Sequence, residues 1–229
     1  QALAAGVVEV RRQLDAGQRL ARVREELLDL ERIRHSGRVA KPDLRRPGPP
    51  GPHPVVVCSH GFKGFKDWGF HPWLGTRLAE AGLAAVHFNF SRNGVRAADG
   101  DIEDLDAFAR NTLSTERDDL DAVLDSVLAG TLDPALAPRR LGLFGHSRGG
   151  GIALLGAAER SEVRALVTWA AVSHFDRIGD EEVLAEWRRT GAFEVVNSRT
   201  GQKLPMGVAF LDDVLANLAE RAVSLRYVR

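Results

Sequence analysis

Four short apolar segments, separated by turns and amphipathic stretches, set the strongest limit on how this chain can fold. The apolar segments span residues 54–59, 83–90, 140–145 and 163–173, and helical periodicity covers residues 72–82, 115–130 and 148–160. Apolar runs of this length that alternate with helices are typical of parallel strands buried on both faces. The sequence therefore predicts an α/β fold: a mostly parallel sheet with helices on both faces, whose strands end at one shared edge.

The segments on either side of this pattern differ from it in composition. Residues 7–34 are charged and carry an imperfect apolar stripe, which predicts a surface helix, and residues 41–54 are rich in proline and glycine, which predicts a linker or entry loop. We therefore expect three parts: an N-terminal helix and linker (1–50), an α/β core (51–173) and a cap-like segment with the chain end (174–229).

Within the cap-like segment, the periodicity predicts two helices joined by a hairpin. The helices are expected over residues 180–191 and 210–223, and the hairpin over 193–206 with its turn near Thr200 and Gly201. In the core, Thr115 is the expected N-terminal cap of the helix over 115–130.

Charge and cysteine content narrow the expected partners. The 31 Lys and Arg residues balance the 31 Asp and Glu residues, so no overall field favours nucleic acid or an anionic membrane surface. The single cysteine, Cys58, lies in an apolar segment and is expected to be a buried thiol, and no signal-like start is present. These features favour a cytoplasmic protein with a small-molecule partner, and they leave its oligomeric state open.

The segment Gly145-His146-Ser147-Arg148-Gly149 fits the pattern G-x-S-x-G between a predicted strand and a predicted helix. A serine on such a tight turn is lifted clear of the sheet edge, and Gly145 and Gly149 allow the strand and the helix to approach closely. The helix N-terminus also offers a backbone N–H to a developing oxyanion. Ser147 is therefore the candidate nucleophile, and a simple helix-capping serine is the alternative.

A second motif, residues 59–70, follows the first predicted strand of the core. The backbone N–H of Phe62 and that of Arg148 are the expected oxyanion-hole donors, because two N–H groups must converge on one oxygen. His60 and Gly61 are expected to order this loop rather than to supply the base.

The other side chains near these motifs have plain alternatives. Trp68, Phe70 and Trp73 are expected either to line the substrate pocket or to pack on the first helix. Arg148 is expected to form a surface ion pair rather than to bind an anionic substrate group. The acidic residues of the helix over 115–130 are expected on a solvated face, and no residues show the spacing of metal ligands; these acidic residues are Asp118, Asp119, Asp121 and Asp125.

The strand followed by His-Gly-Phe, the stretch FNFSRNG (88–94) and GHSRGG together resemble the α/β-hydrolase superfamily. The resemblance runs from about residue 52 to residue 173 and points to the branch of dienelactone-hydrolase-like and prolyl-oligopeptidase-like esterases. It implies an α/β-hydrolase fold, with residues 174–223 similar to the insertion that caps the site in that branch. Dienelactone hydrolases proper carry cysteine at the nucleophile position, whereas this chain has Ser147.

The residue that takes the proton of Ser147 is not evident. In the family the order is serine, acid, histidine, with the acid and histidine after later strands, and this sequence shows neither strand. Of its seven histidines only His174 follows Ser147. Three interpretations stay open: the acid and histidine lie beyond Arg229 and the fold here is incomplete; His174 is a displaced base oriented by Asp176 or Asp180; or the protein binds ligands without turnover.

The expected function is that of a serine hydrolase that cleaves carboxylic esters, or peptide and amide bonds, through an acyl-enzyme at Ser147. This chemistry needs neither a metal nor an organic cofactor. The alternative is a non-catalytic ligand-binding protein of the same fold.

Overall fold

The computed structural model describes residues 42–48, 51–96, 101–136, 140–175 and 178–226, which belong to one compact unit, Val39–Arg229. The predicted helix over 7–34 lies outside the described residues. Among the described helices, none has the length and apolar character needed to cross a membrane.

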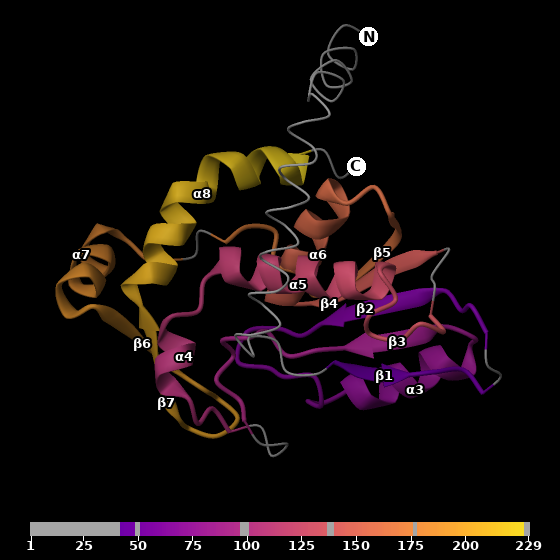
Figure 1. Cartoon of the computed structure of the whole chain (residues 1–229). Helices are drawn as coiled ribbons and strands as arrows, with labels where there is room; N and C mark the ends of the chain where they lie inside the picture. The colour runs from indigo at the N-terminus through magenta and orange to yellow at the C-terminus, as the bar shows by residue number, and fades with distance from the viewer. Residues whose placement is uncertain (1–41, 49–50, 97–100, 137–139, 176–177, 227–229) are drawn as a thin grey trace, which may run out of the picture. The chain divides into compact units, whose positions relative to one another are not determined.

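The centre of the unit is a sheet of five strands in the order β1-β3-β2-β4-β5 (Figure 1). The strands β2, β3, β4 and β5 run parallel, whereas β1 is antiparallel to β3. Their bounds are β1 Asp43–Arg45, β2 Val55–Ser59, β3 Ala84–His87, β4 Leu141–His146 and β5 Val163–Trp169. The predicted α/β fold with a mostly parallel sheet is therefore confirmed.

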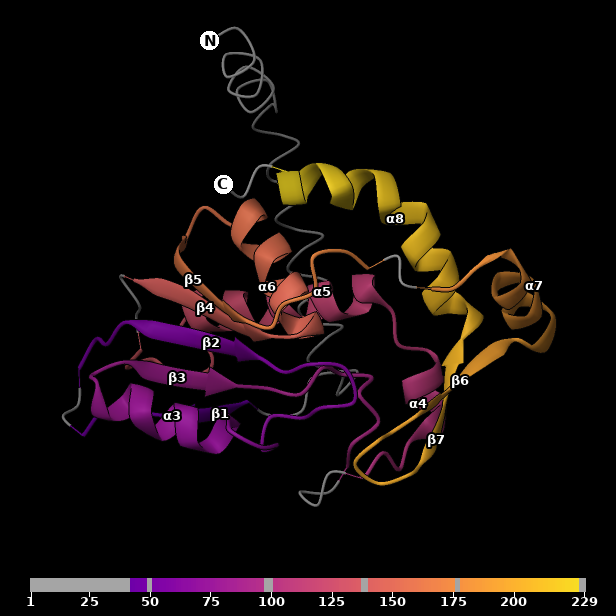
Figure 2. The same ribbon diagram turned by 180° about the vertical axis from the view of Figure 1, so that it is seen from behind.

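Helices cover both faces of the sheet, with α5 (Leu113–Leu128) and α6 (Arg148–Glu159) on one face and α3 (His71–Glu80) on the other (Figures 1 and 2). The main core lies under α5 and α6, where side chains such as Val57, Leu120 and Leu143 are almost fully buried. The N-terminal cap of α5 is Thr112, whose side chain accepts a hydrogen bond from the N–H of Thr115. The expectation that Thr115 is the cap was wrong, because the helix begins earlier.

Two short elements were not expected. Part of the proline- and glycine-rich stretch forms the edge strand β1, whose Leu44 pairs with Val86 of β3, so this stretch is more than a linker. A single-turn helix, α4 (Leu105–Ala109), precedes α5 and is capped by the Asp104 side chain. Edge strands tolerate prolines nearby, and three residues give no readable periodicity.

After β5 the chain builds a smaller layer from α7 (Glu181–Thr190), the antiparallel hairpin β6 (Ala192–Val196) and β7 (Lys203–Gly207), and α8 (Val208–Arg226). Asp180 caps α7 by accepting a hydrogen bond from the N–H of Val183, and Gly191 ends the helix with φ 80°. Trp187 is buried and donates its indole N–H to the carbonyl of Met206 at 2.8 Å, which fixes α7 on the hairpin. The expected helix–hairpin–helix order is observed.

At the edge of the sheet opposite β1, the strand β5 carries exposed apolar side chains. Val167 and Trp169 are 60% and 57% exposed, on the face of the sheet that carries α3. The predicted strand over 163–173 is shorter in the structure, because Ala170 adopts φ 50° and turns the chain away from the sheet.

Candidate active site

Ser147 occupies the sharp turn between β4 and α6, with φ 53° and ψ −121°. Its N–H donates to the carbonyl of Trp169 at 3.0 Å, and its carbonyl accepts from the N–H groups of Gly150 and Val172. A non-glycine residue in this backbone region is strained and is held there only by its surroundings. The Ser147 side chain makes no capping hydrogen bond to α6, so the helix-capping alternative does not apply.

The glycines around Ser147 allow backbones to pass at distances that a side chain would block. A Cβ on Gly149 would lie 2.2 Å from the carbonyl oxygen of His60, and one on Gly145 would lie 2.5 Å from that of Gly149. A Cβ on Gly61 would approach the Cβ of Ser147 to 3.1 Å. The loop after β2 therefore packs directly against the turn that carries Ser147.

His60 is held at both ring nitrogens. Its Nδ1 lies 2.9 Å from the carbonyl oxygen of Gly61, and its Nε2 accepts the N–H of Phe90 at 3.3 Å. Burial lowers the pKa of His60 to about 3, so the ring is neutral and donates from Nδ1. This arrangement ties the loop to the segment after β3 and leaves His60 unsuited to accept a proton.

The two expected oxyanion-hole residues lie at the same cavity as Ser147. Arg148 is the first residue of α6, so its N–H is one of those that a helix leaves outside its own hydrogen-bond pattern. Phe62 follows Gly61 in the loop beside Ser147, and both Phe62 and Arg148 line the cavity. The convergence of their two N–H groups on one oxygen stays a prediction.

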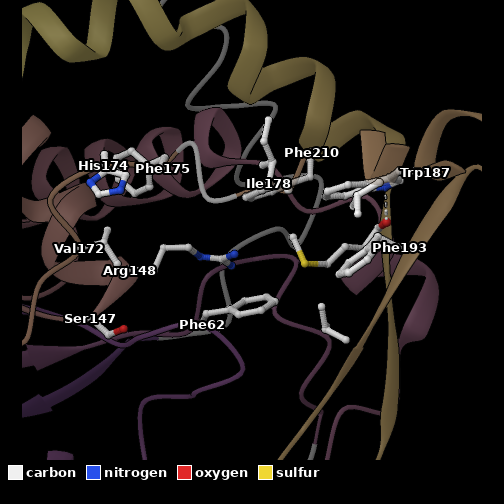
Figure 3. A pocket seen from close by; sticks show the side chains of 14 residues that line it. Phe62, Ser147, Arg148, Val172, His174, Phe175, Ile178, Trp187, Phe193 and Phe210 are labelled. Atoms are coloured by element: carbon white, nitrogen blue, oxygen red, sulfur yellow. Dashed lines mark hydrogen bonds between the residues drawn. The ribbon is translucent and has the colours of Figure 1, made fainter. Parts of the chain in front are cut away.

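The cavity has a volume of about 450 Å³ and lies between the Ser147 turn and the layer formed after β5 (Figure 3). Its walls are mostly aromatic and aliphatic; the lining residues are Phe62, Ser147, Arg148, Val172, His174, Phe175, Ile178, Gly179, Val183, Trp187, Phe193, Val195, Met206 and Phe210. Most of these follow β5, so this layer covers the candidate nucleophile as a cap would.

The aromatic residues proposed as pocket candidates lie elsewhere. Phe70 packs against Phe144, His146 and Trp169 on the α3 face of the sheet, and Trp73 is 65% exposed. The Trp68 ring lies 6.1 Å from the His146 ring, also away from the lining. None of the three lines the cavity, so the pocket alternative was wrong, and Phe70 packs beside the first helix as the other alternative stated. The pocket takes its aromatic residues mainly from the cap.

Arg148 forms a buried ion pair, and the expectation of a surface ion pair was wrong. Its Nη2 donates to Oε1 of Glu116, and the two side chains are 11% and 3% exposed. The guanidinium lies 4.1 Å from the centre of the Phe62 ring, and Figure 3 shows the two side chains next to each other. Sequence reasoning missed Glu116, because an acidic residue in the first turn of a helix is explained by the helix dipole alone.

Asp119 is also buried, so the acidic residues of α5 are not all on a solvated face. Its Oδ2 accepts the N–H of Ser91 at 2.7 Å, and burial raises its pKa to about 7. Asp121 and Asp125 instead pair with Arg160 at the surface. Among the residues that the structure describes, no group of His, Cys, Asp or Glu side chains is placed to hold a metal ion.

His174 lines the same cavity as Ser147, and its Nδ1 lies 2.7 Å from Oγ of Ser173. Asp176, its proposed partner, lies outside the described residues. Asp180 uses a carboxylate oxygen to cap α7. The described contacts therefore bring His174 to the site but show no role for Asp180 beyond the helix cap.

Three further histidines, His71, His87 and His146, lie on the α3 face of the sheet. The rings of His71 and His87 are 5.6 Å apart, and burial lowers their pKa values to about 3 and about 4. Cys58, on β2 beside His87 in the sheet, is buried as expected. These side chains belong to the packing of α3 and do not line the Ser147 cavity.

Solved structures with the same fold include several hydrolases. A protein of Agrobacterium vitis S4 that is described as a hydrolase is 21% identical, with 77% of this chain and 65% of that chain covered and a TM-score of 0.58. Mouse alpha/beta hydrolase domain-containing protein 10 is 20% identical, with 76% and 64% covered and a TM-score of 0.57. Est1E of Butyrivibrio proteoclasticus, solved with ferulic acid, is 22% identical, with 79% and 67% covered and a TM-score of 0.52.

The chain thus spans a little less than two thirds of the Agrobacterium protein's length. No curated protein sequence matches it at a significant level. The model of the dienelactone hydrolase family matches residues 41–181, which is more than half of the chain and includes both the loop after β2 and the Ser147 turn. The chain therefore belongs to the dienelactone hydrolase family and has the α/β-hydrolase fold.

Proposed function

We propose that this protein is a serine hydrolase that cleaves carboxylic esters, and by extension amide or peptide bonds, through an acyl-enzyme at Ser147. The observation that carries the proposal is the backbone of Ser147, strained at φ 53° at the start of α6, with a side chain that makes no capping bond and borders an apolar cavity. A strained serine that serves no local hydrogen bond is typical of a nucleophile.

In the proposed reaction, Oγ of Ser147 attacks the carbonyl carbon of the ester as a base removes its proton. The carbonyl oxygen takes the negative charge, which the N–H groups of Phe62 and Arg148 stabilise. The bond to the alcohol oxygen then breaks, the alcohol leaves with a proton returned by the base, and water hydrolyses the acyl-enzyme in the same two stages.

For the base, we propose a histidine and an acid supplied by sequence that follows Arg229 in a longer protein. Two contacts support this over a dyad of His174 and Asp180: the Asp180 carboxylate caps α7, and His174 contacts its own neighbour Ser173. His174 as a displaced base is the competing assignment, because it shares the cavity with Ser147.

Labelling with a fluorophosphonate probe tests the proposal on the longest form of the protein that can be produced. We expect the protein to be labelled and Ser147→Ala to lose the label, since the probe forms its bond with an activated serine. Ser161→Ala, at an exposed residue after α6, is the matched control and should label as the parent does.

Equal labelling of the parent and Ser147→Ala would contradict the proposed nucleophile. A His174→Gln variant assigns the base: labelling that persists supports a base outside the described residues, and labelling lost with Ser147 still in place supports His174. If the parent binds ligands but neither labels nor turns over esters, the protein is a non-catalytic member of its family.

A further inference from the structure

The Ser147 cavity combines apolar walls with a single permanent charge. Of the fourteen described residues that line it, only Arg148 is always ionised, and the walls around it come from side chains such as Phe62, Phe210 and Ile178 (Figure 3). A guanidinium in such a position would ordinarily attract an anionic group of a substrate. The contacts of Arg148 decide whether it is available for that role.

The guanidinium of Arg148 lies among the side chains that line the cavity (Figure 3) and is ion-paired with Glu116. Glu116 does not line the cavity; it is 3% exposed and accepts a hydrogen bond from Arg148 through Oε1. The same oxygen also accepts from Nδ2 of Asn111 at 2.7 Å, which holds the carboxylate in place. The cavity therefore meets a neutral ion pair rather than a free cation.

Two aromatic rings lie close to the guanidinium. The central carbon of Arg148 lies 4.1 Å from the ring centre of Phe62 and 5.6 Å from that of Phe210. A guanidinium this close to aromatic rings gains a cation–π attraction and packs as part of the pocket wall. A second carboxylate brought into this space would lose its hydration without gaining an unshared cation, which is unfavourable in an apolar cavity.

We propose that Glu116 determines the specificity of this pocket. By neutralising Arg148, it makes the pocket select substrates whose bound group is uncharged and aromatic or aliphatic, and it makes the pocket reject groups that end in a carboxylate. The inference rests on the proposed function, because it names the substrate class of the same site.

Equilibrium binding to the Ser147→Ala protein tests this without requiring turnover. The probes are para-propylbenzamide and para-(2-carboxyethyl)benzamide, which are matched in length and differ in a terminal methyl or carboxylate group. We expect the neutral probe to bind at least about tenfold more tightly, a difference of ~1.4 kcal/mol. Calorimetry provides the readout, and intrinsic tryptophan fluorescence, to which Trp187 in the cavity lining contributes, provides a second one.

In the Ser147→Ala background, Glu116→Gln removes the negative charge and keeps a hydrogen-bonding amide. We expect the preference to shift by about tenfold or more toward the carboxylate probe, because Arg148 is then an unpaired cation in an apolar site. Adding Arg148→Met to Glu116→Gln should restore the preference for the neutral probe. Asp125→Asn lies on the same helix, where Asp125 pairs with Arg160, and should leave both affinities unchanged.

Two results would overturn the inference. Tighter binding of the carboxylate probe to the protein with Glu116 intact would show that Arg148 receives the anion in spite of its pairing with Glu116. An unchanged preference in folded Glu116→Gln would show that Glu116 has no part in specificity. If that variant does not fold, the probe preference with Glu116 intact still decides the substrate class. Fluorophosphonate labelling is independent of both binding measurements. Failure of the proposed function would appear as unchanged labelling in Ser147→Ala, whereas failure of this inference would appear only in the probe affinities.

Discussion

At the scale of single residues, the Ser147 turn requires neighbours that have no Cβ atom. Gly149 lies where the carbonyl oxygens of Ser59 and His60 pass close to the first turn of α6. The backbone around the nucleophile therefore tolerates no added methyl group there, even though a glycine in a helix is normally replaced by alanine with a gain in stability.

We predict that Gly149→Ala lowers the free energy of unfolding by about 1–3 kcal/mol, because its Cβ would lie 2.2 Å from the carbonyl oxygen of His60. Urea unfolding followed by circular dichroism measures this. Gly48→Ala is the control: Gly48 has no atom within 4 Å of the added Cβ, so its stability should stay within about 0.5 kcal/mol of the parent. Equal stability of the two variants would contradict the close approach.

Sequence reasoning identified Ser147, Phe62 and Arg148, which the structure brings to one cavity, because their motifs are short and local. It misjudged the surroundings of Arg148 and Asp119, which are buried by contacts with residues about thirty positions away. Such contacts leave no periodic pattern in the sequence, so neither Glu116 as a partner of Arg148 nor the raised pKa of Asp119 was predictable.

At the scale of helices and strands, the cap and the core are joined at the start of α5. Oδ2 of Asp213, on α8, accepts the N–H of Ser114 at 3.0 Å, and Oδ1 accepts the Ser114 hydroxyl. Ser114 is the second residue of α5, so a carboxylate from the cap satisfies one backbone N–H that the helix leaves unpaired and complements the helix dipole.

We predict that Asp213→Ala lowers the free energy of unfolding by about 1 kcal/mol, the usual cost of losing a helix-capping acceptor. Its neighbour Asp212 provides the control, because it forms an exposed pair with Arg188 and its removal should cost no more than about 0.5 kcal/mol. Thermal unfolding of both variants in low and moderate salt is the measurement. A larger loss for Asp212→Ala than for Asp213→Ala would refute this role of Asp213.

The elements themselves were largely predictable, because apolar runs and helical periodicity are local signals. The wrong predictions concern a strand end and a short strand that are both determined by contacts with distant residues. The segment predicted as a strand over 83–90 ends as β3 at His87, since Phe90 turns its N–H to the His60 ring, and β1 exists only because β3 offers an edge to pair with.

At the scale of the whole molecule, buried histidines set the response to acid. Burial lowers the pKa values of His60, His71 and His87 from 6.5 to about 3, about 3 and about 4. Below pH 6.5 the unfolded chain therefore binds protons that the folded chain does not, and stability falls as the pH falls. Asp119 acts in the opposite direction, because its pKa is raised from 3.8 to about 7 and its contribution to stability grows on acidification.

We predict that the free energy of unfolding decreases with falling pH between about 6 and 4, since the histidines outnumber Asp119. His71→Phe should reduce the slope by about 1.4 kcal/mol per pH unit, the contribution of one proton, because His71 is fully buried and phenylalanine does not titrate. Urea midpoints across this range measure the slope. An identical slope with and without His71 would show that its ring does not stay neutral in the folded protein.

The edge strand β5 and the segment after it hold the backbone of the candidate nucleophile in place. The last carbonyl of β5, that of Trp169, receives the N–H of Ser147, and Val172, three residues later, donates its N–H back to the carbonyl of Ser147. These two hydrogen bonds hold the strained turn against the end of β5. The other edge of β5 has no partner strand among the described residues. We expect a strand that pairs with the free edge of β5 to restrict the motion of Trp169, and through its hydrogen bond with Ser147 to restrict the motion of the Ser147 turn as well.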